Sequence, residues 1–174
     1  YARGRIMAEA TNLARDMANE PANYMTPTDM AEVAIKVAQE YGLEFEVLEK
    51  KDIEKLGMGA LLGVSQGSRQ PPKFITLNYK GDDSSKTPLG FIGKGITFDS
   101  GGISIKPSEG MGDMKGDMSG GAAVIAAMRA IGELKPKINV TALIPATENL
   151  PDGAAVKPGD ILKAMNGKTI EIVN

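Results

Sequence analysis

The sequence has 174 residues, of which 42% are hydrophobic and 24% charged, the composition of one globular domain with a buried core. Its formal net charge of -2 argues against an extended nucleic-acid-binding surface, and no apolar run approaches the roughly 20 residues of a membrane span. Cysteine and histidine are both absent, which excludes disulfides, thiolate nucleophiles, Ser-His-Asp triads and zinc sites built from those ligands. The remaining polar groups suit hard cations with oxygen ligands.

The first part of the sequence predicts helices on both sides of one strand. Apolar residues recur at helical spacing near the start, and Thr26-Pro27 supplies the cap and the early proline of a second helix. In chain order we expect a helix over 5–18, a helix from Thr26 to Gly42, a half-buried strand over 43–48 and a short helix over 52–56.

The second part predicts most of a β-sheet. We expect strands at 74–79, 89–92 and 138–144, a helix over 119–134 and a smaller β segment over 161–173. The 89–92 run is apolar, and we expect it to be a central strand. Helices that alternate with apolar strands indicate a layered α/β fold. Ligands in such folds bind where loops leave the carboxyl ends of strands, so the loop after residue 92 is the candidate site.

This loop contains two glycine-dense runs, 93–102 and 111–121. Glycine at this density costs conformational entropy, and its use is the close approach of backbone to something bound. A phosphate-binding P-loop is excluded because Gly93-Lys94 is followed by Gly95 rather than by Ser or Thr. The dinucleotide-binding pattern fails as well, because position 98 is Phe rather than Gly.

Charged residues in the loop have the chemistry of a two-metal site. Asp99 and Asp117 offer carboxylates, and one carboxylate can bridge two cations. Lys94 could bind a metal as the neutral amine, the form that nearby dications favour, while a charged Lys106 could stabilise a developing oxyanion. The plainer alternative is that the aspartates form turns and the lysines are solvated charges. The residues alone leave both interpretations open.

Two motifs resemble the leucyl aminopeptidase family: the run from Gly93 through Pro107 and the run from Met114 through Ala123. The likeness extends through the segments Asn12–Asp16, Asn19–Asn23, Thr26–Pro27, Glu148–Pro151 and Lys157–Ile161. It implies a layered α/β/α fold with a mixed, mostly parallel central sheet, as in zinc peptidases. It also implies a metal-dependent aminopeptidase that uses a two-metal-activated water to release N-terminal residues, preferably leucine, from peptides.

The same resemblance implies roles for particular residues of this sequence. Lys94, Asp99 and Asp117 match metal ligands, with Asp99 bridging two divalent cations that would be Mn or Zn. Lys106 matches the catalytic lysine that polarises the scissile carbonyl and binds the tetrahedral intermediate. Met114 matches a residue that lines the pocket for the first side chain of the substrate.

The resemblance assigns residues 1–174 to the front part of a catalytic domain, without the family's separate N-terminal domain or its C-terminal remainder. The chain starts without Met and stops without a cap or polar tail, so we expect both ends to be cuts through a longer protein. In the family, the remainder supplies an Asp and a Glu ligand and an arginine that holds bicarbonate. We therefore expect the 174 residues alone to be inactive, and the whole protein to be a cytoplasmic homohexamer that acts on peptides without a membrane partner.

Two other functions stay open at this stage. Some bacterial members of the family bind DNA, although the acidic net charge and the 5% aromatic content argue against a base-stacking surface here. The first alternative thus covers a nucleic-acid-binding or regulatory role. The other alternative is a structural or interaction fragment that keeps the loop only for folding, because a fold alone does not establish activity.

Overall fold

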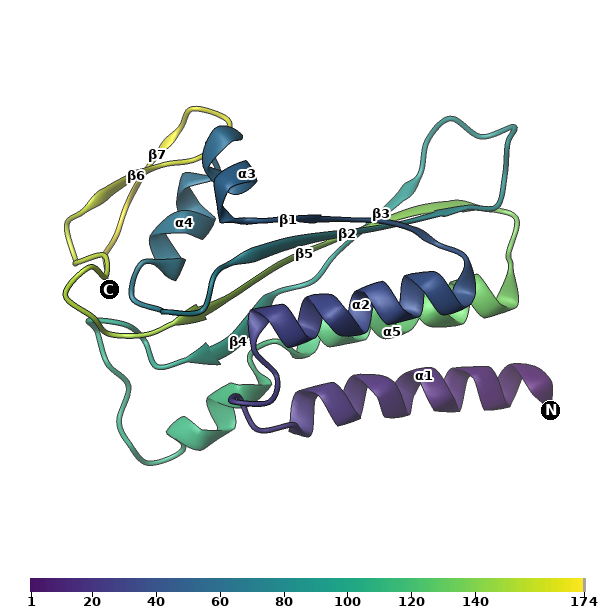
Figure 1. The fold of residues 1–174 in the computed structure, drawn as a ribbon, viewed down its shortest axis with the longest axis horizontal. Helices are drawn as coiled ribbons and strands as arrows, with labels where there is room; N and C mark the ends of the chain where they lie inside the picture. Colours follow the sequence, from purple (N-terminus) through teal and green to yellow (C-terminus); the bar gives the residue numbers. More distant parts are fainter. Residues whose placement is uncertain (174) are drawn as a thin grey trace.

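Helices and strands alternate along the chain, as the ribbon of the computed structural model shows for residues 1–173 (Figure 1); Asn174, the last residue of the sequence, lies outside the described residues. The elements are α1 (Ala2–Asn19), α2 (Pro27–Tyr41), β1 (Glu44–Leu48), α3 (Lys50–Lys55), α4 (Gly59–Ser65), β2 (Lys73–Lys80), β3 (Leu89–Ile92), β4 (Gly95–Asp99), the 3-10 helix η1 (Met111–Gly116), α5 (Ser119–Leu134), β5 (Asn139–Asn149), β6 (Ile161–Lys163) and β7 (Thr169–Glu171). Each helix and strand predicted from the sequence is present.

β5 is the centre of a five-stranded sheet with the order β1-β2-β5-β3, and β4 pairs with β5 beyond the end of β3. The pairs β1–β2 and β2–β5 are antiparallel, whereas β3–β5 and β4–β5 are parallel. The layered α/β fold with a mixed sheet is thus confirmed, with two parallel and two antiparallel pairs in this sheet rather than mostly parallel ones. β6 and β7 form a separate antiparallel pair.

The central position predicted for 89–92 is not seen in residues 1–173. β3 pairs there with β5 alone, and its Leu89 and Ile92 are 54% and 77% exposed. The central strand is β5, which the sequence predicted only in part. An apolar run of this length indicates a strand but carries no information about how many neighbours the strand has.

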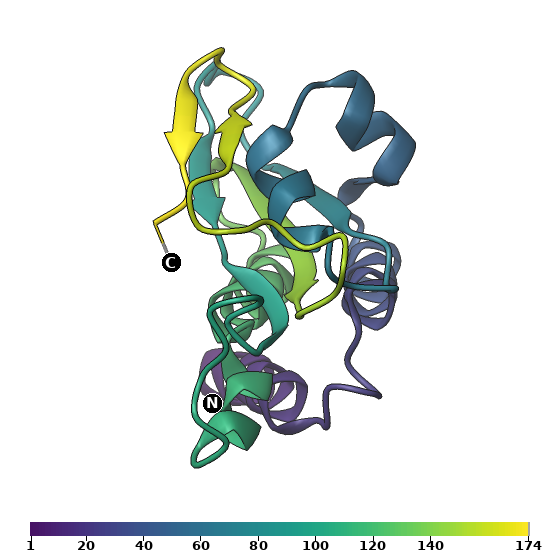
Figure 2. The ribbon, with the colours of Figure 1, turned by 90° about the vertical axis from the view of Figure 1, so that its left-hand side faces the viewer.

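Helices lie on both sides of the sheet. α2 and α5 cover one face, and α1 packs against α5 on the side away from the sheet (Figure 1). The short helices α3 and α4 lie on the opposite side, near one end of the sheet, as the view along the molecule also shows (Figure 2). These layers leave the loops after β4 and before α5 together at one end of the molecule.

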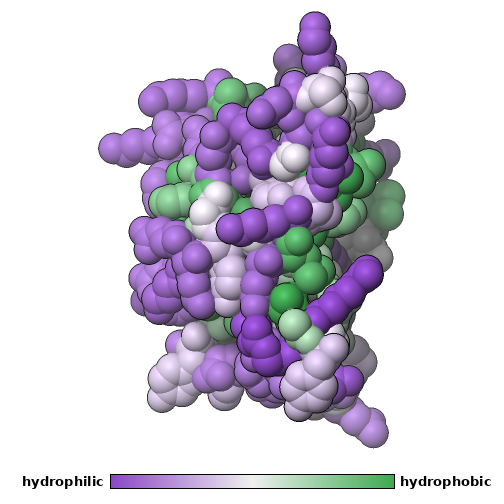
Figure 3. Space-filling model, turned by 90° about the vertical axis from the view of Figure 1, so that its right-hand side faces the viewer, coloured by the Kyte–Doolittle hydropathy of each residue, from purple (hydrophilic) through white to green (hydrophobic). Residues whose placement is uncertain are grey.

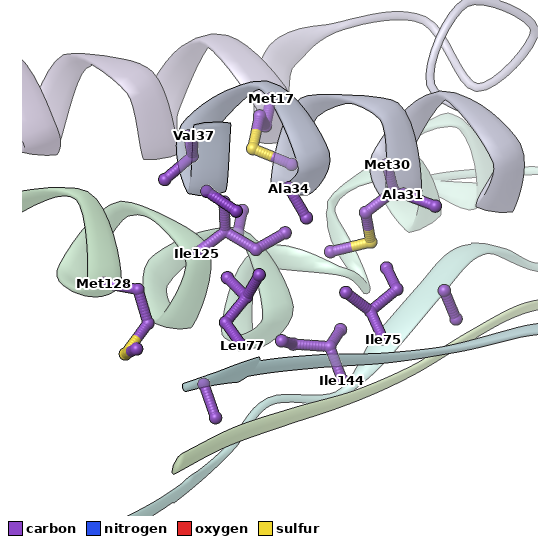
Figure 4. Packing of buried hydrophobic residues seen from close by; sticks show 14 of the residues in the cluster. Met17, Met30, Ala31, Ala34, Val37, Ile75, Leu77, Ile125, Met128 and Ile144 are labelled. Atoms are coloured by element: carbon purple, nitrogen blue, oxygen red, sulfur yellow. The ribbon is translucent and has the colours of Figure 1, made fainter. Parts of the chain in front are cut away.

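The main core fills the space between the sheet and its two long helices (Figure 4). Alternate residues of β2 and β5 point to this face, since side chains alternate along a strand, and Ile75 pairs directly with Ile144. Both are fully buried, together with Met30 of α2 and Ile125 of α5. The period-2 pattern of the strands and the helical spacing of α2 and α5 therefore meet in one apolar layer.

The bounds of α2 follow from its capping residues. Thr26 and Asp29 form a capping box, in which the Thr26 N–H donates to Asp29 Oδ2 at 2.9 Å and the Asp29 N–H donates to Thr26 Oγ1 at 3.3 Å. Gly42 ends the helix in the left-handed region, with φ of +68°. Both predicted ends of this helix are confirmed.

β5 continues five residues beyond the predicted end at 144, to Asn149. The continuation includes Pro145, which donates no N–H to a sheet and is unusual in a central strand. Within the sheet, Leu143 pairs with Ile92 of β3 and Ala146 pairs with Gly95 of β4. Pro145 therefore lies where β5 changes its parallel partner, and its missing N–H coincides with the break between β3 and β4.

Three elements were not predicted: α4, β4 and η1. α4 was not predicted because it contains glycine, which disfavours a helix. A Cβ on Gly59 would lie 2.1 Å from the Lys163 carbonyl oxygen of β6. β4 was not predicted because it contains glycine and a bulge, at which its register with β5 shifts between Ile96 and Phe98. In these segments glycine serves close packing between backbones, which the local sequence does not reveal.

An apolar hollow of about 490 Å³ lies between the start of α1 and the end of α5, at the opposite end of the molecule from β4. It is lined by Arg3, Met7, Ala127, Ala130, Ile131, Leu134 and Pro136. Figure 3 shows hydrophobic side chains among hydrophilic ones on this side of the molecule. Within residues 1–173, no helix has the length and apolar character to cross a bilayer.

Candidate active site

The predicted site residues lie at the end of the molecule where β4 leaves the sheet. Asp99 is the last residue of β4, Lys94 lies in the short gap between β3 and β4, and Asp117 follows η1 just before α5. Figure 2 looks onto this end and shows β4 beside η1. Because β3 and β4 both run parallel to β5, their carboxyl ends point to the same edge of the sheet.

Two glycines form a tight turn that returns Lys106 to the end of β4. Gly101 and Gly102 have φ angles of +91° and +67°, which side-chain-bearing residues rarely adopt. The Lys106 N–H closes the turn by donating to the Ser100 carbonyl at 2.9 Å. Ser100 is anchored in turn, because its N–H and its hydroxyl donate to the Asn149 carbonyl at 2.9 and 2.8 Å. The chain reversal therefore explains the double glycine of the motif.

Asp99 accepts hydrogen bonds on both carboxylate oxygens. Oδ1 accepts from the Asn149 side-chain amide at 2.7 Å and from the Gly101 N–H at 3.0 Å, and Oδ2 accepts from the Lys106 ammonium at 2.6 Å. Burial raises the pKa of Asp99, but these hydrogen bonds, that from Lys106 foremost, outweigh burial and hold the pKa below the usual aspartate value. The ionised Asp99 stabilises the fold at neutral pH, and this contribution is lost as the pH falls through the lowered pKa.

The backbone at Lys94 is held against the N-terminus of α5. The Gly121 N–H donates to the Lys94 carbonyl at 2.8 Å. A Cβ on Gly93 would lie 2.7 Å from the Gly120 carbonyl oxygen, so the two backbones approach too closely for side chains. The glycines at the start of α5 and at the end of β3 therefore allow the contact that places Lys94.

Replacing Gly121 by alanine is expected to lower the melting temperature of the whole protein. The added Cβ would lie 2.5 Å from Met30 Cε, 2.8 Å from Ile144 Cγ2 and 3.1 Å from the Lys94 carbonyl oxygen. Such overpacking typically costs about 1–3 kcal/mol. Gly4→Ala is the matched control, since no atom lies within 4 Å of a Cβ there and alanine favours a helix by roughly 0.5–1 kcal/mol. Calorimetry showing Gly121→Ala melting at or above the wild type would contradict the close contact at Lys94.

Lys94 and Asp117 form a second charged pair. Lys94 Nζ lies 2.9 Å from Asp117 Oδ2, with the lysine side chain 60% exposed and the aspartate side chain 23% exposed. Asp117 Oδ2 itself is buried and accepts no hydrogen bond of standard geometry, although the Lys94 ammonium is its charged neighbour. A buried carboxylate oxygen without a hydrogen bond is unusual, and a cation would satisfy it. The donor set at this point therefore fits a metal ion.

The structure groups the predicted residues into two adjacent pairs. A cavity of about 280 Å³ is lined by Asp99, Gly101, Ser104, Lys106 and Asn149. The Lys94–Asp117 pair is not part of that lining and belongs to the neighbouring contact of β4, η1 and α5. Met114 is half-buried on η1 and is joined to Asp117 by the backbone, whose N–H donates to the Met114 carbonyl at 3.2 Å.

The described residues offer few carboxylates that could bind metal ions at this site. Among residues 1–173, no group of three or more Asp, Glu, His or Cys side chains is arranged to hold a metal ion. The donors that the site offers are Asp99, Asp117 and the amine of Lys94. This set is smaller than two cations ordinarily require.

Asn149 is a site residue that sequence reasoning did not single out. It lies in register with Asp99 across the parallel pair β4–β5, and its side chain contacts that carboxylate directly. The signal in the sequence was its position after a β-branched strand, at the carboxyl end where ligands collect. Ending the strand at residue 144 hid this signal, because it placed Asn149 in a loop.

Comparison with known proteins gives the same assignment as the motifs. Residues 12–174 match the family described as "Cytosol aminopeptidase family, catalytic domain". The chain is 58% identical over 171 residues to a protein named "Probable cytosol aminopeptidase" from Alkaliphilus metalliredigens, covering 98% of this chain and 34% of that protein. It is 60% identical over 174 residues to a protein of the same name from Solibacter usitatus, covering 99% of this chain and 36% of that protein. The chain thus spans about a third of the length of these relatives.

A solved structure is similar to this chain in both fold and sequence. The bottromycin maturation enzyme BotP, in complex with Mn, superposes with a TM-score of 0.91 and 42% sequence identity, over 98% of this chain and 37% of BotP. The chain belongs to the cytosol aminopeptidase family, and it corresponds to part of the family's catalytic domain.

Proposed function

We propose that the whole protein carrying these residues is a metal-dependent aminopeptidase, with its site at the carboxyl end of β4. The observation that carries the proposal is the buried, unbonded oxygen of Asp117 beside Lys94, next to a second Asp–Lys pair in a glycine turn. Membership of the cytosol aminopeptidase family supports the reaction class. A solvated turn would leave its aspartate oxygens to water, whereas here they are held within the fold.

In this proposal Lys94, Asp99 and Asp117 hold two divalent cations. BotP was solved in complex with Mn, which makes Mn the first metal to test, with Zn the alternative. When bound, such a cation pair supplies a water activated as nucleophile near neutral pH. Lys94 would bind as the neutral amine, the form that two nearby dications favour, in place of its present ion pair with Asp117. Asp99, ionised at neutral pH, would bridge the two ions.

Lys106 and Met114 would act on the substrate rather than on the metals. Lys106 lines the cavity, and its ammonium donates to Asp99 Oδ2, the oxygen that accepts no hydrogen bond from Gly101 or Asn149. As a charged donor it would polarise the scissile carbonyl and stabilise the negative oxygen that develops there. Met114, a flexible apolar side chain on η1, would line the pocket for the first side chain of the substrate.

A pair of substrates tests the reaction class. With purified whole protein and added Mn²⁺, we expect hydrolysis of leucine p-nitroanilide and no hydrolysis of N-acetyl-leucine p-nitroanilide, because an exopeptidase requires the free α-amine. Chelation should abolish the activity, and Mn²⁺ or Zn²⁺ should restore it. Equal cleavage of both substrates, or activity that survives chelation, would contradict the proposal.

The remaining expectations concern the whole protein. We expect a preference for N-terminal leucine, a homohexamer, peptide substrates and a cytoplasmic location, and we expect nucleic acid to have no role. Because the described residues offer only two carboxylates and one lysine to two cations, residues 1–174 alone should hold metals weakly and be inactive. The bicarbonate that the family resemblance implies would need an arginine from outside this segment.

A further inference from the structure

We propose that Asn149 is a positioning residue for Asp99, holding the carboxylate in the orientation that metal binding requires. This inference rests on the proposed function, since it assigns Asn149 to the same site. The side-chain amide of Asn149 donates to Asp99 Oδ1 at 2.7 Å, and the two residues are paired across β4 and β5. Asn149 acts through Asp99 and is not itself expected to touch the substrate.

The carboxylate of Asp99 needs an external restraint. The terminal torsion of an aspartate side chain is broad, so the side chain itself does not fix the plane of its oxygens. In this structure Oδ1 is held by two N–H donors, the Asn149 amide and the Gly101 backbone, and Oδ2 is left toward Lys106 and the cavity. Removal of the amide would leave one backbone donor on Oδ1.

The surroundings of Asn149 favour this side chain over others. A Cβ on Gly102 would lie 2.8 Å from Asn149 Oδ1, so the glycine makes room for the amide. The amide nitrogen faces the ionised Asp99, because the reverse orientation would place an acceptor against a carboxylate. The Asn149 backbone carbonyl meanwhile accepts both donors of Ser100. The end of β5 thus restrains the carboxylate through its side chain and the following turn through its backbone.

If Asn149 had only a structural role, its replacement would lower the stability of the fold and leave the affinity for metal unchanged. The following experiment measures both quantities. Mn²⁺ is titrated into the metal-free whole protein, with the free ion measured by electron paramagnetic resonance, for the wild type, Asn149→Ala and Asn78→Ala. Asn78 is the matched control, because its side-chain oxygen accepts a hydrogen bond from Thr141 between β2 and β5, away from the site. Melting temperatures of the metal-free proteins report the fold.

We expect Asn149→Ala to bind Mn²⁺ about 10–100-fold more weakly, the usual effect of removing a residue that orients a metal ligand. Excess Mn²⁺ should restore its aminopeptidase activity, and Asn78→Ala should bind Mn²⁺ like the wild type. Asn149→Ser is the second variant if the alanine protein does not fold, with the same weakening expected.

Four results would overturn the inference. If Asn149→Ala binds Mn²⁺ as tightly as the wild type, or if Asn78→Ala loses as much affinity, the positioning role is wrong while the proposed function stands. If both Asn149 variants fail to fold, the residue is structural. If the wild type binds no Mn²⁺ or Zn²⁺, the proposed function falls and this inference falls with it.

Discussion

Replacing Asp99 by asparagine is expected to reduce the aminopeptidase activity of the whole protein by more than about 100-fold, beyond the usual effect of losing a residue that only orients a ligand. Asparagine has nearly the same volume but lacks the negative charge that two cations would share. It would also place an amide where Oδ2 now bonds Lys106 at 2.6 Å. Because Asp99 lies at the end of a paired strand, the backbone should be unaffected and the loss should be one of metal binding.

The Asp99→Asn experiment measures kcat/KM with leucine p-nitroanilide together with Mn²⁺ binding. Asp52→Asn is the matched control, since Asp52 forms an exposed pair with Lys55 at 3.4 Å, away from the site. Exposed pairs of this kind contribute little, so the control should match the wild type in both measurements. An Asp99→Asn protein that retains wild-type activity would show that this loop is not the active site, and the structural-fragment interpretation would then be favoured.

Replacing Lys106 by methionine is expected to lower kcat by about 10²–10³-fold, the range found for removal of one charged or polar group that stabilises a developing oxyanion. Methionine keeps much of the length of lysine but has no charge. In contrast to Asp99→Asn, this variant should still bind Mn²⁺, because Lys106 is proposed to act on the substrate carbonyl. The Asp99 carboxylate keeps its Asn149 and Gly101 donors when the lysine is removed.

Lys80→Met serves as the matched control for the Lys106 variant. Lys80 is an exposed residue of β2 and pairs with Glu44 at 2.7 Å, on a part of the sheet remote from the cavity. Its replacement should leave kcat and Mn²⁺ binding unchanged. If Lys106→Met lost Mn²⁺ binding as fully as Asp99→Asn does, the lysine would be a support for the aspartate rather than a catalytic group.

Local sequence signals were sufficient to predict those helices and strands whose conformation depends mainly on their own residues. The capping box at Thr26 and the left-handed Gly42 set both ends of α2, and the β-branched run of β5 predicted the first half of the central strand. What could not be predicted depends on partners distant in the sequence. Pro145 is tolerated only because β3 gives way to β4 beside it, and β4 contains a glycine and a bulge that fit β5.

For the site, residue chemistry and spacing predicted which residues belong to the loop but not how they pair. The structure pairs Lys94 with Asp117 and Lys106 with Asp99, across gaps that no spacing rule gives. These pairs depend on the glycine contact between β3 and α5 and on the double-glycine turn. Asn149 was missed because its contact with Asp99 exists only once two parallel strands are in register.

Anomalous diffraction from Mn²⁺-soaked crystals of the whole protein would decide whether Lys94, Asp99 and Asp117 hold divalent cations. We expect anomalous peaks within bonding distance of both carboxylates, with the lysine amine also bound and the Lys94–Asp117 ion pair of 2.9 Å replaced by metal contacts. Density that shows this ion pair intact and no anomalous peak beside Asp99 or Asp117 would contradict the two-metal site.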